Sequence, residues 1–292
     1  MIFRSLLLVS FALTALACEP VGPEGPRGDV LRYPAAVAVD PAGRYAYVLN
    51  TNFDSRYSGG SLVAVDLEQG HIVSSSAVET YSYGSRIVGH ADAQGGFDRL
   101  YFTTREGNAL NRATVTLNGA AGPRITCTDA GADSGHLPRC GGEYVISSED
   151  GSSSAGSDPF AIGMVPGKNG GPDHLLTTAF GGTTNLFRLD GSGVPTFLQA
   201  EYVGSGLYDV AVHPVLGSAF FSTKFRNVIA AMDIFDSGED DEAPFVTVDD
   251  AIVISSPILG TEYGRAMAFG EGGDLLYLAY RGPPAGVVIT DT

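Results

Sequence analysis

Apolar and polar residues alternate in short runs along most of the chain. Residues 35–50 read "AAVAVDPAGRYAYVLN", which is two apolar runs joined by a turn containing Asp40, Pro41 and Gly43. A third run, "GSLVAVD", follows at residues 60–66. A period of two is typical of β-strands with one buried face, and Asp, Pro and Gly are typical turn residues. This stretch therefore predicts three consecutive antiparallel strands.

The same order of strands and turns recurs four more times, at intervals of roughly 45 to 75 residues. The further copies cover residues 86–119, 160–191, 208–233 and 265–291. Repeats of this length with strand periodicity predict an all-β chain folded as a β-propeller of four-stranded blades. We expect the propeller to cover residues 34–292, with an insertion at about 120–157.

About five blades are visible, and the last copy stops after its third strand. Because an open propeller exposes strand edges, we expect the sequence to be truncated or incomplete. A true five-bladed ring, or closure by N-terminal residues or by another chain, are the alternatives.

The first copy also resembles a known family. "YVLN" at Tyr47–Asn50 matches the signature of the YVTN-repeat propellers except at Leu49, and the Asp40–Pro41 turn and the "VAVD" strand match their flanks. These proteins are relatives of the lactonase-type propellers. The resemblance implies a β-propeller fold and an exported location, but no particular reaction.

The N-terminus predicts export and lipidation. Residues 1–17 have a charge at Arg4, an apolar run and a small residue before Cys18, which is the pattern of a signal peptide. "TALAC" resembles the lipobox of bacterial lipoproteins, which implies a lipid on Cys18, and Glu19 favours sorting to the outer membrane. Residues 18–33 are predicted to be a Pro/Gly tether. An ordinary signal peptide with an unrelated cysteine is the alternative.

Composition narrows the partners and the compartment. The net charge of −16 excludes a nucleic-acid-binding protein with a general basic surface. In an exported protein, Cys127 and Cys140 are expected to form a disulfide. A metal site with His136 is the alternative, but it lacks further ligands.

Cations recur where the second strand of several copies ends. The aligned residues are Thr51, Arg105, Ala179, Lys224 and Arg281, and Arg56 lies further along the first loop. Because these loops of a propeller share one face, Arg56, Arg105, Lys224 and Arg281 are a candidate basic rim for an anionic ligand. Chance alignment is the alternative.

The first of these loops also offers oxygen ligands at alternate positions, Asn50, Asn52 and Asp54. Such spacing can hold calcium, although Ser55 and Ser61 stand where a calcium loop has Gly and Glu. Ordinary turn chemistry is the alternative, and no other cofactor is expected.

Three functions remain open from the sequence. The first is a lipid-anchored envelope protein whose propeller is a binding or scaffold module for a small anionic ligand or an envelope protein. The second is a lactonase-like hydrolase, since propeller active sites assemble from distant blades without a linear motif. The third is a truncated propeller without independent activity.

Overall fold

In the computed structural model, the described residues are 24–128, 136–147, 156–167, 171–224, 228–234, 245–247, 252–253, 264–270, 272–280 and 286–291. The predicted signal peptide, Cys18 and Arg281 lie outside this described part. No helix within it is long and apolar enough to cross a membrane.

The first repeat forms a four-stranded antiparallel sheet in the order β1-β2-β3-β4. Its strands are β1 (Pro34–Val39), β2 (Tyr45–Asn50), β3 (Gly60–Asp66) and β4 (His71–Thr80). The turn after β1 is held by Asp40, whose Oδ1 accepts the N–H groups of Arg44 (2.7 Å) and Tyr45 (3.3 Å). Gly43 adopts the left-handed φ of +67° that this turn requires. The predicted strands and turn are confirmed.

Four further sheets follow in the same order along the chain. Blade 2 contains β5 (Gly84–Ala91), β6 (Phe97–Thr104), β7 (Ala109–Leu117), β8 (Pro123–Thr126) and β9 (Val145–Ile146). Blade 3 contains β10 (Pro159–Val165), β11 (His174–Ala179), β12 (Thr183–Leu189) and β13 (Pro195–Tyr202). Blade 4 contains β14 (Leu207–Val212), β15 (Ser218–Thr223), β16 (Val228–Ile234), β17 (Phe245–Thr247) and β18 (Ile252–Val253). Blade 5 contains β19 (Gly264–Phe269), β20 (Leu275–Tyr280) and β21 (Gly286–Asp291). Three short 3-10 turns, Glu106–Asn108, Gly119–Ala121 and Gly142–Tyr144, are the helical segments of the described residues.

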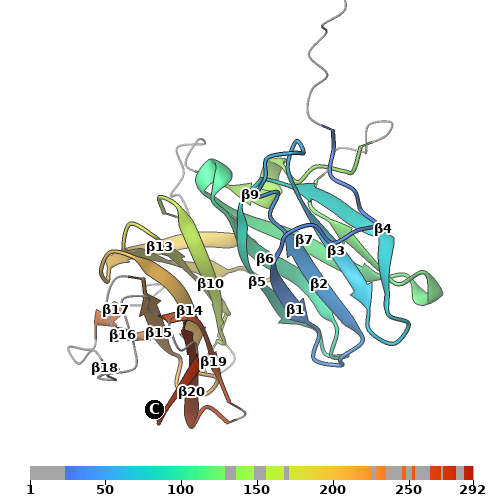
Figure 1. Cartoon of the computed structure of the whole chain (residues 1–292). Coiled ribbons are helices and arrows are strands. Elements are labelled where there is room, and N and C mark those ends of the chain that lie inside the picture. Colours follow the sequence, from blue (N-terminus) through green and yellow to red (C-terminus); the bar gives the residue numbers. More distant parts are fainter. Residues whose placement is uncertain are drawn as a thin grey trace, which may run out of the picture.

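The five sheets form a five-bladed β-propeller, as the repeats predict (Figure 1). The first strands β1, β5, β10, β14 and β19 each lie against the next one, and apolar clusters fill the spaces between neighbouring blades. Tyr47 of blade 1 packs against Phe97 of blade 2, for example, with ring centroids 5.8 Å apart. Among the described residues, no extensive contact returns from blade 5 to blade 1.

The last described residues of the predicted tether lie against blade 1. Glu24 forms an isolated β-bridge with Tyr57, and the Ser58 N–H donates to the Glu24 carbonyl (3.0 Å). Gly28 lies directly against the side chains of Ala77 and Leu137. We call residues 24–33 the strap. Only residues 19–23 separate Cys18 from it.

The predicted disulfide between Cys127 and Cys140 is confirmed. Both cysteines are buried, and residues 138–140 lie beside β4 of blade 1. There the Glu79 N–H donates to the Pro138 carbonyl, and the Cys140 N–H donates to the Glu79 carbonyl, both at 2.8 Å. Part of the segment that we expected to be an insertion thus joins two blades, and β8 within it gives blade 2 its fourth strand.

Candidate functional site

One backbone position repeats at the entry to the first strand of four blades. Its residues all have a left-handed φ, between 49° and 80°: Tyr33, Tyr83, Asp158 and Gly206. A β-bulge or register shift follows in every one of these strands. A bulge bends the strand locally, so each blade enters the propeller with the same turn of the chain.

The carbonyls of these four residues accept hydrogen bonds from the residues that directly follow the second strands. The donors are the N–H groups of Thr51 (3.1 Å), Arg105 (3.1 Å), Phe180 (2.9 Å) and Lys224 (2.7 Å). These donors are therefore structurally equivalent, and we call them the rim residues. The alignment is confirmed for Thr51, Arg105 and Lys224. It was wrong by one residue in blade 3, because Ala179 is the last residue paired with β10 and Phe180 occupies the rim.

Two predicted rim cations lie on one aromatic cluster. The Arg105 guanidinium is 5.2 Å from the ring centre of Phe160, and the Lys224 ammonium is 5.4 Å from that of Phe180. The two rings are themselves 5.9 Å apart. Arg56 is separate from this cluster, with its guanidinium 5.8 Å from the Tyr57 ring. The structure thus brings Arg105 and Lys224 together and leaves Arg56 on the loop of blade 1.

Arg105 is also part of an ion pair. Its guanidinium forms a fork with the carboxylate of Asp158, through Nε to Oδ1 and through the terminal nitrogen to Oδ2 at 2.9 Å. Bidentate pairs of this kind fix the orientation of both side chains. Since both groups are only half-buried, the pair adds little to stability, but it offsets the positive charge of the predicted rim.

A groove of about 560 Å³ lies beside this pair, where the loops of blades 1 and 2 meet the entry of blade 3. Every residue that lines it carries a hydrogen-bonding side chain: Asn52, Ser55, Tyr57, Ser58, Ser82, Tyr83, Arg105, Glu106 and Asp158. Local contacts hold several of these groups in place. Glu106 Oε2 accepts the Ser82 N–H (2.5 Å), and the hydroxyls of Ser55 and Tyr83 are 3.0 Å apart.

The loop between β2 and β3 owes its shape to Asn52. The Asn52 Oδ1 accepts the Tyr57 N–H (3.0 Å), and the Asn52 Nδ2 donates to the Tyr57 carbonyl (2.9 Å) and to the Ser82 hydroxyl (3.1 Å). Asn52 is buried and has a left-handed φ of 51°. Asparagine tolerates this conformation better than most residues, because its short polar side chain can bond locally.

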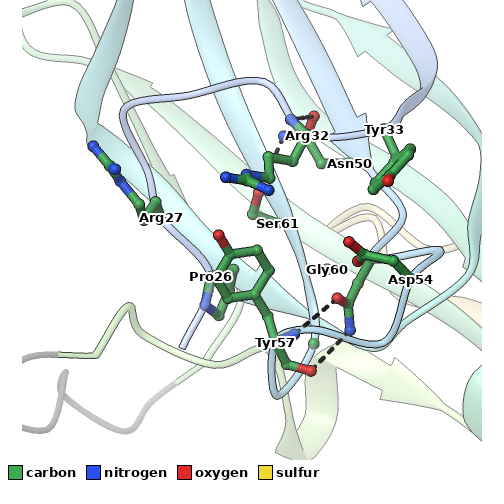
Figure 2. A pocket seen from close by; sticks show the side chains of 11 residues that line it. Pro26, Arg27, Arg32, Tyr33, Asn50, Asp54, Tyr57, Gly60 and Ser61 are labelled. Carbon is green, nitrogen blue, oxygen red and sulfur yellow. Dashed lines mark hydrogen bonds between the residues drawn. The ribbon is translucent and has the colours of Figure 1, made fainter. Parts of the chain in front are cut away.

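The predicted calcium ligands do line a common cavity, but a very small one. Asn50, Asn52 and Asp54 border a space of about 10 Å³, enough for one water molecule, together with Arg27 and Arg32 of the strap (Figure 2). Asn50 Oδ1 already accepts the Arg32 N–H (3.1 Å), as Asn52 Oδ1 does that of Tyr57. The calcium site stays a prediction, and two nearby guanidinium groups count against it.

No described cluster of three or more His, Cys, Asp or Glu side chains could hold a metal ion.

An ion pair that sequence reasoning missed joins blades that are not neighbours. Arg86 of β5 donates to Asp209 of β14, with 3.0 Å between Nε and Oδ1 and a second, parallel contact. Asp209 Oδ2 also accepts the Met267 N–H of blade 5 (2.8 Å). Burial raises the pKa of the Asp209 carboxyl, while the Arg86 charge acts in the opposite direction. We call Arg86 and Asp209 the central pair.

The comparisons with known proteins bear on the fold. No family model matches the sequence, and no curated protein matches it. Solved structures do match. A candidate 6-phosphogluconolactonase from Bacteroides uniformis has a TM-score of 0.59 at 15% identity, covering 90% of this chain and 68% of that one. The periplasmic gluconolactonase of Pseudomonas aeruginosa has a TM-score of 0.52 at 15% identity, covering 90% of this chain and 72% of that one. A protein of unknown function from Desulfotomaculum acetoxidans has a TM-score of 0.58 at 12% identity, covering 87% of this chain and 70% of that one.

The fold is shared with lactonase-like propellers. At these identities the likeness shows the fold alone, so the chemistry must be argued from the residues of this chain.

Proposed function

We propose that this protein is a binding module whose groove, beside the Arg105–Asp158 pair, takes a small polyhydroxylated ligand. The observation that carries the proposal is the lining of the groove. Each of its nine side chains can donate or accept a hydrogen bond, and two of them, Tyr57 and Tyr83, also present aromatic rings. Sites for polar ligands combine a few fixed polar groups with rings that supply contact area.

The charges in the groove favour hydroxyl groups over an anion. One arginine, Arg105, stands against two carboxylates, Glu106 and Asp158. Carboxylates accept hydrogen bonds from hydroxyl groups but repel anions. The sequence led us to expect an anionic ligand. In this proposal the part of the ligand inside the groove is neutral, and any acidic group on it would have to reach Arg56 or Lys224 outside the groove.

The names of two structural neighbours agree with this class of ligand. Both refer to lactones of gluconic acid, which are polyhydroxylated molecules. This supports the proposal without determining it, because the likeness extends to the fold alone.

Calorimetric titration tests the proposal. The probes are gluconate, glucono-δ-lactone and a neutral hexose, added to the wild type, to Glu106→Gln and to Glu68→Gln. Glu68 is exposed in the turn after β3 and lies outside the groove, so it is a matched control. We expect Glu106→Gln to weaken binding by about ten-fold, the typical effect of one hydrogen bond to a charged group. No binding of any probe to the wild type would contradict the proposal.

Lactone hydrolysis is the second candidate, and the central pair favours it. Arg86 is part-exposed while Asp209 is almost fully buried, at 32% and 4% of their side-chain surfaces. A guanidinium held in this way could stabilise the oxyanion that forms when water attacks a lactone carbonyl. Asp209 would then position Arg86. A pH-stat assay with glucono-δ-lactone tests this, and activity that survives Arg86→Gln would contradict it.

We also propose that the protein is exported and anchored by a lipid on Cys18, with the outer membrane as the destination. The signal-like N-terminus supports this, and a buried disulfide is typical of proteins in oxidising compartments. Metabolic labelling with a fatty-acid analogue tests it, since Cys18→Ser should abolish the label.

A further inference from the structure

The corner of blade 1 next to the strap carries three exposed apolar side chains. Leu31, Tyr33 and Phe53 expose 45%, 50% and 69% of their surfaces. Tyr33 and Phe53 lie together, with ring centroids 6.4 Å apart. Single exposed apolar residues are ordinary, but two exposed aromatic rings in contact, with an exposed leucine two residues away in the sequence, are a candidate patch.

Two arginines border the patch. The guanidinium of Arg32 is 5.6 Å from the ring centre of Tyr57, and that of Arg56 is 5.8 Å from the same ring (Figure 2 shows Arg32 and Tyr57). Neither guanidinium has an ion pair among the described residues. The charge of Arg27 is offset by Asp29, 2.7 Å away. Asp54 of the same loop offsets part of the charge of Arg32 and Arg56, so this corner is less acidic than the chain as a whole, whose net charge is −16.

The chain reaches the predicted anchor from this same corner. Glu24 is fixed at Tyr57 by a β-bridge and by the hydrogen bond from Ser58. Six residue steps separate Glu24 from Cys18. Six steps span at most about 21 Å when fully extended. A lipid on Cys18 would therefore hold this corner near the bilayer, whatever path the six residues take.

We propose that Leu31, Tyr33 and Phe53, flanked by Arg32 and Arg56, form a docking surface for an anionic phospholipid bilayer. The inference rests on the lipid anchoring proposed above. Aromatic rings and arginine side chains are favoured at membrane interfaces, because each combines an apolar body with a polar end. Since Asn52 and Ser55 of the same loop line the groove, docking places the groove beside the membrane surface.

The absence of tryptophan from the sequence gives a direct test. Phe53→Trp places a single fluorophore in the patch. Tyr202→Trp is the matched control, since Tyr202 is 68% exposed at the end of β13 in blade 3. Each lipidated variant is reconstituted into phosphatidylglycerol-containing vesicles, with and without brominated acyl chains, and mass spectrometry verifies the lipid on Cys18.

Docking predicts that the emission of Phe53→Trp shifts to the blue and is quenched by brominated lipid, while that of Tyr202→Trp changes in neither way. If the protein floats with the vesicles and the emission of Phe53→Trp is unchanged, the docking surface is refuted while the anchor stands. Equal changes in both variants would also refute it. If mass spectrometry finds no lipid on Cys18 and the protein does not float with the vesicles, both the anchor and the docking surface are refuted. The proposal that the groove binds a ligand is not affected by that result.

The arginines give a second readout. Arg56→Gln should weaken binding to phosphatidylglycerol vesicles by about five-fold, the typical effect of one basic residue at an anionic surface. Arg124→Gln, an exposed residue of β8, is the control and should have no effect. Equal affinities for Arg56→Gln and the wild type would overturn the electrostatic part of the proposal.

Discussion

Arg86 and Asp209 lie 123 residues apart in sequence and form a two-pronged ion pair between blades 2 and 4. The Met267 N–H of blade 5 binds the same carboxylate. Three blades thus depend on one buried side chain. Among the described residues, the extensive contacts between blades join blades that are neighbours along the chain, so this pair is a separate connection between blades 2 and 4.

Loss of the arginine should destabilise the protein strongly. Arg86→Gln leaves the buried Asp209 without its counter-charge, and breaking a buried pair in this way typically costs about 3 kcal/mol or more. Urea unfolding followed by circular dichroism measures this. Arg124→Gln serves as the control on the surface of blade 2. A loss below about 1 kcal/mol for Arg86→Gln would show that the pair does not hold the blades together.

The central pair also predicts a pH dependence. Since the pKa of Asp209 is raised in the folded state, the folded protein binds more protons than the unfolded chain above pH 3.8, the ordinary value for this group. Stability contributed by this group is then present at low pH and is lost as the pH rises through the folded pKa. The free energy of unfolding of the wild type, minus that of Asp209→Asn, should therefore fall as the pH rises from 3.8 through the folded-state pKa of Asp209. A difference that rises with pH would contradict the assignment.

Reduction of the disulfide should loosen the junction of blades 1 and 2. The bond between Cys127 and Cys140 closes a short loop that is hydrogen-bonded to Glu79 of β4. Closing a loop of this size is worth about 3 kcal/mol in the chain-entropy model. The double variant Cys127→Ser, Cys140→Ser should therefore unfold at a lower temperature than the wild type. If reductant lowers the melting temperature of the double variant as much as that of the wild type, the effect does not come from this bond.

The left-handed entry position should tolerate only certain residues. Gly206 has a φ of 80°, at the position where other blades have Tyr33, Tyr83 and Asp158. Gly206→Ala should cost about 1 kcal/mol, because a Cβ is unfavourable in this conformation. Gly181→Ala is the control: Gly181 is exposed and nothing crowds its Cβ position. If Gly206→Ala and Gly181→Ala are equally stable, a Cβ at position 206 causes no backbone strain, and the prediction is wrong.

The fold could be predicted from the sequence because it rests on local patterns. Alternating residues and turn chemistry are visible within each repeat. The pairing of Cys127 with Cys140 was expected because the N-terminus predicts export, where disulfides are common. The alignment of the second-strand ends was correct at Arg105 and Lys224, while their role in binding an anion stays a prediction. In blade 3 the alignment was wrong by one residue, with Ala179 in place of Phe180. The sequence alone does not show where the pairing of β11 with β10 ends.

The central pair could not be predicted in the same way. A bulge in β5 lies between Gly84 and Ile87, and it contains Arg86. Its partner lies two blades away, so no spacing in the sequence relates them. One signal was present: Asp209 stands at an inner position of an apolar strand, where Ala36 and Ala161 occupy the same register in blades 1 and 3. A charged residue at such a position implies a buried partner.

Amide chemical-shift mapping tests the central claim, the ligand groove, most directly. Isotope-labelled protein is titrated with gluconate and with a neutral hexose. We predict saturable shifts at Asn52, Ser82, Tyr83 and Glu106, and none in the turn of blade 1 that contains Glu68. Saturable shifts confined to other parts of the propeller, or no shifts with either probe, would contradict the account.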